Sequence, residues 1–518
     1  MRSALRAIAF CLGAGLGIAR ADALYHEPYR PQFHFSPPQQ WMNDPNGLVY
    51  SQGEYHLFYQ YNPYSNKWGP MHWGHAVSRD LVRWENLPIA LYPDRHGTIF
   101  SGSAVVDTAN TSGFGTKEHP PLVALFTYHD HLSENLGGTG FESQGLAYSP
   151  DNGRNWVKYA ENPVLTSPAV RDFRDPKLFW YEPDRRWIVV LAVADHVAFY
   201  SSPDLKHWRH ESDFGQGWGA HGGVWECPDL FATVIDGTGI KKSVLLISVG
   251  KGGPNGGSAT RYFIGQFDGH RFTLDDDQLQ KLQASPQWLD YGTDDYAGST
   301  WSGDAARDGQ QRFIGWMSNW QYAEDVPTER WRGVMTLPRE LHLVATVRGL
   351  ELHSIPAREL DTLRSKSLPI AARRGAGDMN LTRLAGAKGG LLEIDLNLDL
   401  LNSKLVELRF ANARGQATVL RVDRRQGRYE LDRSASGSVA FKPAFPALQV
   451  APIPGGDRVL RLRAYVDHSS LELFLNGGET VFTALVFPSD PYELIELKAD
   501  QEIELTAGTV HELRSIWQ

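Results

Sequence analysis

Ser78–Trp84 reads SRDLVRW, and this turn-like pattern recurs along the first half of the chain. The other copies are Ser149–Trp156 (SPDNGRNW), Ser202–Trp208 (SPDLKHW) and, more faintly, Asp268–Phe272 (DGHRF), with their aspartates 71, 53 and 64 residues apart. Each copy reads as a turn that ends in an aromatic residue at the start of a strand. Turns of this kind are common, so coincidence is the alternative, but four copies in register with Trp or Phe argue against it. Units of this length with several short strands are typical of β-propeller blades, so the repeat predicts a β-propeller.

The pattern changes after residue 345. Ser354–Leu360 (SIPAREL) has a serine and a proline placed as at the start of a short helix, and we expect a linker over 346–366. Beyond it, apolar and polar residues alternate, as in Leu405–Phe410 and Leu460–Val466, which is typical of antiparallel sheets packed on one face. The sequence therefore predicts an all-β chain with a propeller over 22–345 and a β-sandwich over 367–518.

The composition of the 518 residues excludes several classes of protein. Hydrophobic residues make up 42% and charged residues 21%, so the chain can bury a core and is not expected to be disordered. The formal net charge is −9 and no long basic run occurs. A nucleic acid is therefore not an expected partner, and a neutral substrate fits better.

Residues 1–21 have the features of a cleaved export signal. Arg2 and Arg6 precede an apolar run over 7–18 that is too short to span a bilayer, and Ala19–Ala21 (ARA) is an A-x-A cleavage site. No later segment is apolar over a bilayer-spanning length, so no membrane contact is expected after cleavage. We expect a secreted or periplasmic protein. Cleavage leaves Cys227 as its one cysteine, which excludes an internal disulfide.

Three acidic residues each stand within two positions of a proline. They are Asp44 (WMNDPNG, 41–47), Asp175 (RDPK, 174–177) and Glu226 (WECPD, 225–229). A proline has no N–H to give a sheet, so the chain must leave the ladder nearby, and each carboxylate is expected to point into a cleft. The three are separated by copies of the repeat, so in a propeller they could converge at one end of the axis. Taken singly, Asp-Pro is more often a turn and a tryptophan more often a core residue; only the combination points to function. Convergent carboxylates among aromatic residues suit glycoside cleavage, and the candidate aromatic walls are Trp68, Trp73, Phe100, Trp225, Trp320 and Trp331.

These motifs resemble the signatures of glycoside hydrolase family 32, which contains invertases, exo-inulinases, levanases and fructan exohydrolases. The resemblance extends, in the order of that family, through Phe100–Ala104 (FSGSA), Trp316–Trp320 (WMSNW), Leu337–Leu341 (LPREL) and Val466–Ser470 (VDHSS). It covers nearly the whole chain after residue 21. It implies a five-bladed β-propeller that carries the site, followed by a C-terminal β-sandwich.

The resemblance also implies roles for individual residues. Asp44 would be the nucleophile, Glu226 the acid/base, and Asp175 the residue that holds fructosyl hydroxyls and stabilises the transition state. The residues that match positions lining the fructose subsite are Asn43, Gln60, Trp68, Phe100, Ser101, Arg174 and Trp320. The expected reaction is retaining, exo-acting hydrolysis of terminal β-D-fructofuranosyl residues from fructans, with levan slightly ahead of inulin, and from sucrose. A sucrose-specific invertase and a fructosyltransferase on the same scaffold are the alternatives, and no cofactor is expected.

Two other interpretations fit the sequence less well. A sugar-binding protein without activity would be expected to have lost one of the three acids, and all three are present. His129-Asp130-His131 offers two imidazoles, but no third ligand stands at a useful spacing, so the sequence favours a surface loop there and no metal is expected.

Overall fold

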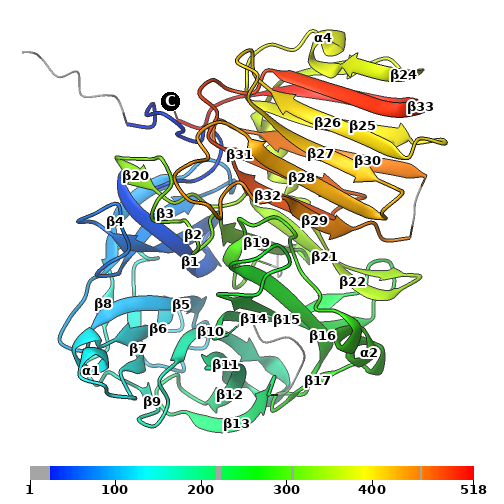
Figure 1. Cartoon of the computed structure of the whole chain (residues 1–518). Helices are drawn as coiled ribbons and strands as arrows, with labels where there is room; N and C mark the ends of the chain where they lie inside the picture. Colours follow the sequence, from blue (N-terminus) through cyan, green and yellow to red (C-terminus); the bar gives the residue numbers. More distant parts are fainter. Residues whose placement is uncertain (1–23, 217–222, 305–307, 456–457, 518) are drawn as a thin grey trace, which may run out of the picture.

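The computed structural model describes residues 24–216, 223–304, 308–455 and 458–517, which form five small sheets followed by a larger β-domain (Figure 1). The expected export signal, residues 1–21, lies outside the described residues. The predicted all-β fold, a five-bladed β-propeller followed by a β-sandwich, is confirmed. No helix in the described part of the chain is long and apolar enough to cross a membrane.

The five blades follow one another along the chain, and the first strands of neighbouring blades contact each other around the axis. The first blade contains β1 (Gln40–Ser51), β2 (Glu54–Asn62), β3 (His72–Ser78) and β4 (Glu85–Leu91). The second contains β5 (Thr98–Val106), β6 (Leu122–His129), β7 (Glu142–Ser149), β8 (Val157–Lys158) and β9 (Leu165–Thr166). The third contains β10 (Phe173–Tyr181), β11 (Arg186–Val193), β12 (His196–Ser202) and β13 (Arg209–Phe214). The fourth contains β14 (Trp225–Val234), β15 (Lys241–Val249), β16 (Ala259–Phe267) and β17 (Phe272–Leu274), and the fifth β18 (Tyr296–Thr300), β19 (Gln311–Trp316), β21 (Arg339–Thr346) and β22 (Gly349–Pro356).

The repeated sequence pattern is the turn between the third and fourth strands of the first four blades. In the first copy the Asp80 carboxylate accepts hydrogen bonds from the backbone N–H groups of Val82 and Arg83. The Trp84 indole N–H then donates to the carbonyl of Leu81, which lies in the left-handed region (φ 61°). In the third copy Asp204 and Trp208 make the same bonds. The pattern therefore recurs because one local hydrogen-bond network builds the same turn in successive blades.

Strand β20 (Trp331–Arg332) closes the ring of blades. It leaves the fifth blade between β19 and β21 and pairs in parallel with the start of β1 in the first blade. A second contact joins the same two blades, where the N–H of Tyr50 donates to the carbonyl of Ser302. The fifth blade is thus tied to the first at both ends of β1, which fixes the inner strands around the axis.

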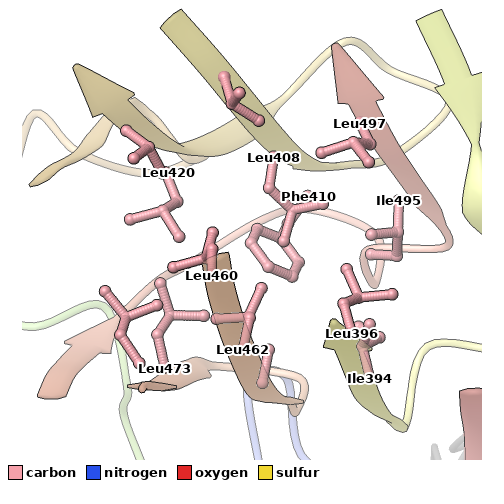
Figure 2. Close-up of a cluster of buried hydrophobic side chains, with 14 of the residues drawn as sticks. Ile394, Leu396, Leu408, Phe410, Leu420, Leu460, Leu462, Leu473, Ile495 and Leu497 are labelled. Carbon is pink, nitrogen blue, oxygen red and sulfur yellow. The ribbon is translucent and has the colours of Figure 1, made fainter. Parts of the chain in front are cut away.

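The C-terminal domain is built on β33 (Leu494–Leu513), a 20-residue strand that belongs to both layers of the sandwich. Its first part pairs with β26 (Leu405–Ala411) and its later part with β25 (Leu392–Asp399). The apolar faces of the two layers meet in the buried cluster drawn in Figure 2, to which alternate residues of β25, β26 and β33 contribute. The other strands are β23 (Arg364–Ile370), β24 (Arg373–Asn380), β27 (Ala417–Asp423), β28 (Arg428–Ala435), β29 (Gln449–Pro452), β30 (Val459–Val466), β31 (Ser470–Leu475) and β32 (Thr480–Leu485).

The segment 346–366, expected as a linker, contains more of the propeller than its sequence suggested. Its first part is β22, the fourth strand of the fifth blade, and Ser354 lies in that strand rather than at a helix start. A short 3-10 helix, η2 (Arg358–Leu363), follows and buries Leu360 and Leu363. The other helices in the described part of the chain are α1 (His131–Asn135), η1 (Glu182–Asp184), α2 (Asp276–Ala284) and α4 (Leu381–Ala385).

A buried network of charges joins the two domains. Arg339 of the fifth blade lies 2.6 Å from Glu472 of β31 and 3.0 Å from Asp295, and all three side chains are buried. Glu472 also lies 2.9 Å from His34, whose other ring nitrogen is 2.7 Å from Asp467. Burial alone would lower the pKa of His34, but its hydrogen bonds to Asp467 and Glu472 raise it to about 9. Separating the domains would leave these charges unpaired in an apolar surface, which is costly.

We therefore expect the propeller and the sandwich to behave as one rigid unit. Differential scanning calorimetry should give a single cooperative transition, and limited proteolysis should leave the 24–517 core intact. An active fragment ending near residue 350, stable without the sandwich, would contradict this expectation.

Candidate active site

The first strands of all five blades are interrupted near the same end of the axis. Each loses its regular pairing with the second strand of its blade over two residues, as at a β-bulge. The interruptions lie between Met42 and Pro45 in β1, Ile99 and Gly102 in β5, Arg174 and Lys177 in β10, Glu226 and Asp229 in β14, and Tyr296 and Ser299 in β18. A bulge redirects side chains that would otherwise alternate across the sheet. The bulges at β1, β10 and β14 direct the side chains of Asp44, Asp175 and Glu226 toward the same pocket.

Three residues other than glycine at these bulges lie in the left-handed region, namely Ala297 (φ 54°) in β18 and two residues that each precede a proline. Asp175 and Cys227 are in the left-handed region, with φ of 61° and 46°. Each precedes a proline, which cannot supply the N–H that a regular ladder would need. Conformations of this kind cost free energy and persist where the surrounding fold imposes them, as at functional sites.

Asp44 is almost fully buried and its two carboxylate oxygens are both hydrogen-bonded. Asn43 donates to one oxygen at 2.9 Å, and the Ser101 hydroxyl donates to the other at 2.8 Å. The indole N–H of Trp41 donates to the Asn43 side-chain oxygen at 2.7 Å and so orients its amide. Burial raises the pKa of Asp44, the bonds from Asn43 and Ser101 oppose that rise, and the nearby Glu226 carboxylate adds to it. The two donors favour the ionised form of the Asp44 carboxyl against the cost of burial.

Asp175, in β10, contacts the part of β14 that follows Glu226. Its carboxylate accepts a hydrogen bond from the backbone N–H of Cys227 at 3.0 Å. The Cys227 thiol bridges the two aspartates, with its sulfur 3.5 Å from Asp44 and 3.6 Å from Asp175. Burial raises the pKa of Asp175 to about 8; Arg174 opposes this, and the charges of Glu226 and Asp44 reinforce it. In the free protein the Asp175 carboxyl is therefore neutral over the mildly acid range and can donate a hydrogen bond there.

Glu226 is the most accessible of the three acids, with its side chain 25% exposed. Arg174 reaches one of its oxygens at 3.1 Å, and the Tyr296 hydroxyl donates to the other. Arg174 is itself held by Asp172 at 2.8 Å and by Glu142 at 3.1 Å. Tyr296 and Glu142 are parts of the site that sequence reasoning missed, since neither stands in a motif quoted for it.

The acids face a pocket with a volume of about 350 Å³. All ten predicted site residues line it: Asn43, Asp44, Gln60, Trp68, Phe100, Ser101, Arg174, Asp175, Glu226 and Trp320. The structure also places His129, His131, Glu134, Phe141, Glu142 and Asp172 in its wall. Three of the candidate aromatic walls are wrong, because Trp73, Trp225 and Trp331 are buried in the core and do not reach the pocket.

A larger cavity of about 920 Å³ opens at the opposite end of the inner strands. Lys177 and Asp229 form a buried ion pair at 3.1 Å between the two cavities, and Lys177 also donates to the Thr300 carbonyl. None of the three acids lines this larger cavity, whose wall is mostly aromatic and aliphatic. The chemistry therefore belongs to the smaller pocket.

Replacing Asp175 by asparagine is expected to stabilise the protein increasingly as the pH rises. The folded protein keeps a proton on Asp175 up to about pH 8, whereas the unfolded chain releases it near 3.8. The free energy of unfolding that the wild type gains from this proton is fully present below pH 3.8. It is lost as the pH rises to about 8. The melting temperature of Asp175→Asn minus that of the wild type should therefore grow over this window, by roughly 2 °C or more, and then level off. A difference that does not change with pH, measured by calorimetry, would contradict the raised pKa.

Comparison with known proteins agrees with this geometry over nearly the whole chain. The family model "Glycosyl hydrolases family 32 N-terminal domain" matches residues 34–356, and the model of the C-terminal domain of the same family matches 359–515. The levanase of Bacillus subtilis (strain 168) is 46% identical over 96% of this chain and 72% of its own. The extracellular exo-inulinase of Aspergillus niger is 38% identical over the full length of both. The crystal structure of the exo-inulinase of Aspergillus awamori superposes with a TM-score of 0.87 at 36% identity, covering 95% of this chain and 100% of the other. The resemblance read from the motifs is thus confirmed, and the chain belongs to family 32 of the glycosyl hydrolases.

Proposed function

We propose that the protein is a retaining exo-β-fructosidase that removes terminal β-D-fructofuranosyl residues from fructans and from sucrose. The observation that carries the proposal is the meeting of Asp44, Asp175 and Glu226, from three different blades, in one small pocket. The names of the relatives, levanase and exo-inulinase, support a fructan as the substrate. The leader-like residues 1–21 and the extracellular description of the exo-inulinase support export.

In the first step the Asp44 carboxylate attacks the anomeric carbon of the terminal fructosyl unit. The bond from that carbon to the glycosidic oxygen breaks, and Glu226 gives its proton to the departing oxygen. Asn43 and Ser101 hold the Asp44 carboxylate in place for the attack. The product of this step is a fructosyl ester of Asp44 and a free alcohol, which is the shortened chain or glucose.

In the second step Glu226, now ionised, takes a proton from water, and the water oxygen attacks the same carbon. The ester bond breaks, fructose leaves, and Asp44 is ionised again. Asp175, with its raised pKa, binds hydroxyls of the fructosyl unit in both steps. Arg174 and Tyr296 contact the two oxygens of Glu226 and so fix the direction in which its proton is delivered.

The size of the pocket favours cleavage at chain ends. A volume of about 350 Å³ accommodates few sugar units, and Trp68, Phe100 and Trp320 stand around it. We expect fructose to be the first product from levan and from inulin. Early-time chromatography of the digests decides this, with the Asp44→Asn protein as the control for contaminating activity. A ladder of oligosaccharides before free fructose would mean endo action.

The same assay separates the alternatives on this scaffold. An invertase would act on sucrose and leave both fructans intact. A fructosyltransferase would pass the fructosyl unit to a sugar, so free glucose would exceed free fructose with sucrose as the substrate. Hydrolysis releases the two sugars in equal amounts. A comparison of kcat/KM for levan, inulin and sucrose then ranks the substrates.

A further inference from the structure

We propose that His129, His131 and Glu134 form a binding site for a divalent transition-metal ion, of the Zn²⁺ type, in the wall of the active-site pocket. His129 ends β6, and His131 and Glu134 belong to the short helix α1 that follows. One ligand atom from each side chain lies within 4.8 Å of the others. The sequence spacing suggested no third ligand, but one turn of α1 brings Glu134 back to the two histidines.

The spacing of the three atoms suits a tetrahedral ion. Nε2 of His129 is 2.9 Å from an Oε atom of Glu134, and Nδ1 of His131 is 4.0 Å from the same oxygen. Zn²⁺ binds imidazole nitrogen and carboxylate oxygen at about 2.0–2.1 Å, so its ligand atoms lie roughly 3.3 Å apart. The observed separations bracket that value. Small side-chain rotations would bring the three atoms to this spacing around an ion.

The groups behind the two histidines orient them as metal ligands. Nδ1 of His129 is 3.2 Å from the buried carboxylate of Glu142, which also accepts a hydrogen bond from the Phe173 N–H at 2.7 Å. A carboxylate behind a ligating histidine fixes its tautomer and leaves the other nitrogen free to bind metal. Nε2 of His131 is 3.3 Å from the Thr98 hydroxyl, so its Nδ1 faces Glu134. Both rings are therefore held with one nitrogen directed at the same point.

Neither of the charged neighbours of Glu134, Asp130 and Arg171, occupies the proposed metal position. Asp130 uses its carboxylate to cap α1, accepting from the N–H groups of Leu132 and Ser133, and so supports the helix rather than the metal. Arg171 is the cation near Glu134, at 3.7 Å from the other carboxylate oxygen, which stays available for that contact when an ion is bound. Three protein ligands leave a fourth position open for water or a substrate hydroxyl.

A bound ion would interfere with hydrolysis. The ring of His131 lies 5.9 Å from that of Trp68, and the ring of His129 stacks on Phe100 at 4.3 Å, so the ion would sit beside the aromatic wall of the pocket. Behind it, Glu142 connects His129 to Arg174, which contacts Glu226. We expect Zn²⁺ to lower kcat/KM by narrowing the pocket and by shifting this chain of contacts. The ion is an inhibitor here and takes no part in the reaction.

Direct binding tests the site independently of the proposed function. Isothermal titration of the EDTA-treated full chain with Zn²⁺ should give one tight site, and Co²⁺ in its place should give the visible absorption of a tetrahedral ion. His131→Ala and Glu134→Gln should each weaken binding at least tenfold. The matched control is His210→Ala, because His210 contacts Asp213 at 2.8 Å on the surface but belongs to no three-ligand group among the described residues. This variant should bind like the wild type.

Two results would overturn the proposal. One is the absence of a single tight site in the wild type. The other is Zn²⁺ binding that is unchanged in both His131→Ala and Glu134→Gln, or that is lost in His210→Ala. With a fructan or sucrose as substrate, each protein is compared with its own rate in EDTA. Zn²⁺ should slow the wild type and the His210→Ala variant severalfold more than His131→Ala.

Discussion

Replacing Asp44 by asparagine is expected to lower kcat/KM by about 10⁴- to 10⁶-fold on every substrate, whatever its leaving group, as removal of an enzyme nucleophile typically does. The amide has the shape of the carboxylate but cannot form the fructosyl ester. It can still accept from Asn43 or contact the Ser101 hydroxyl, so the pocket should keep its form. Because burial raises the pKa of Asp44, removing its charge should not destabilise the fold. The measurement is kcat/KM on sucrose and on an aryl fructoside, together with the melting temperature.

The matched control is Asp172→Asn, which changes another carboxylate in the wall of the same pocket. Asp172 contacts Arg174 at 2.8 Å but none of the three acids, so its loss should cost less than tenfold. A loss in Asp44→Asn that falls mainly on the natural substrate, or that is matched by Asp172→Asn, would remove Asp44 from the role of nucleophile.

The parts of the fold that were predictable are those built by local contacts. The Asp80 and Asp204 turns were visible in the sequence because one carboxylate, two backbone N–H groups and one indole within a few residues make the whole structure. Strand alternation in the C-terminal domain was visible for a similar reason, since one face of each layer is buried in a single core. The C-terminal boundary of the propeller was harder to predict from the sequence. Ser354 and Pro356 look like a helix start, yet they close β22, whose pairing with β21 decides the structure there.

The residues of the site also fall into those that the local sequence marks and those that only the fold brings together. Asp44, Asp175 and Glu226 could be found because each stands by a proline, and the proline marks the break in the strand. Glu142 and Tyr296 carry no such mark: they contact Arg174 and Glu226 across 32 and 70 residues of chain, and only the closed ring brings them together. The same limit explains the wrong tryptophans. Trp73, Trp225 and Trp331 are aromatic residues like Trp68 and Phe100, but they belong to strands β3, β14 and β20 and are buried in the core.

Glu226→Ala is expected to separate substrates by their leaving groups. On sucrose or a fructan the departing oxygen is a poor leaving group, and loss of its proton donor should cost about 10²- to 10⁴-fold in kcat/KM. On an aryl fructoside the oxygen leaves without help, so the first step should be slowed far less. Added azide should then speed turnover, because it attacks the fructosyl ester without needing a base. Asp175→Asn is the matched comparison, since it acts on the fructosyl unit that both substrates share and should depress both alike.

The residues around Glu226 make the Glu226→Ala test specific, because no neighbouring group can replace Glu226 as the proton donor. Arg174 and Tyr296 each contact one of its oxygens, and truncation to alanine leaves both groups next to the space that the Glu226 carboxyl occupied. Arg174 cannot act as the acid in this variant: burial lowers its pKa, but Glu142 and Asp175, which remain, still raise it, and a guanidinium keeps its proton near neutral pH. Tyr296 also holds its proton, since burial, which does not depend on Glu226, is the largest cause that raises its pKa. Neither neighbour can replace the lost proton donor near neutral pH. Equal losses on sucrose and on the aryl fructoside would therefore show that Glu226 positions the substrate rather than protonating the leaving group.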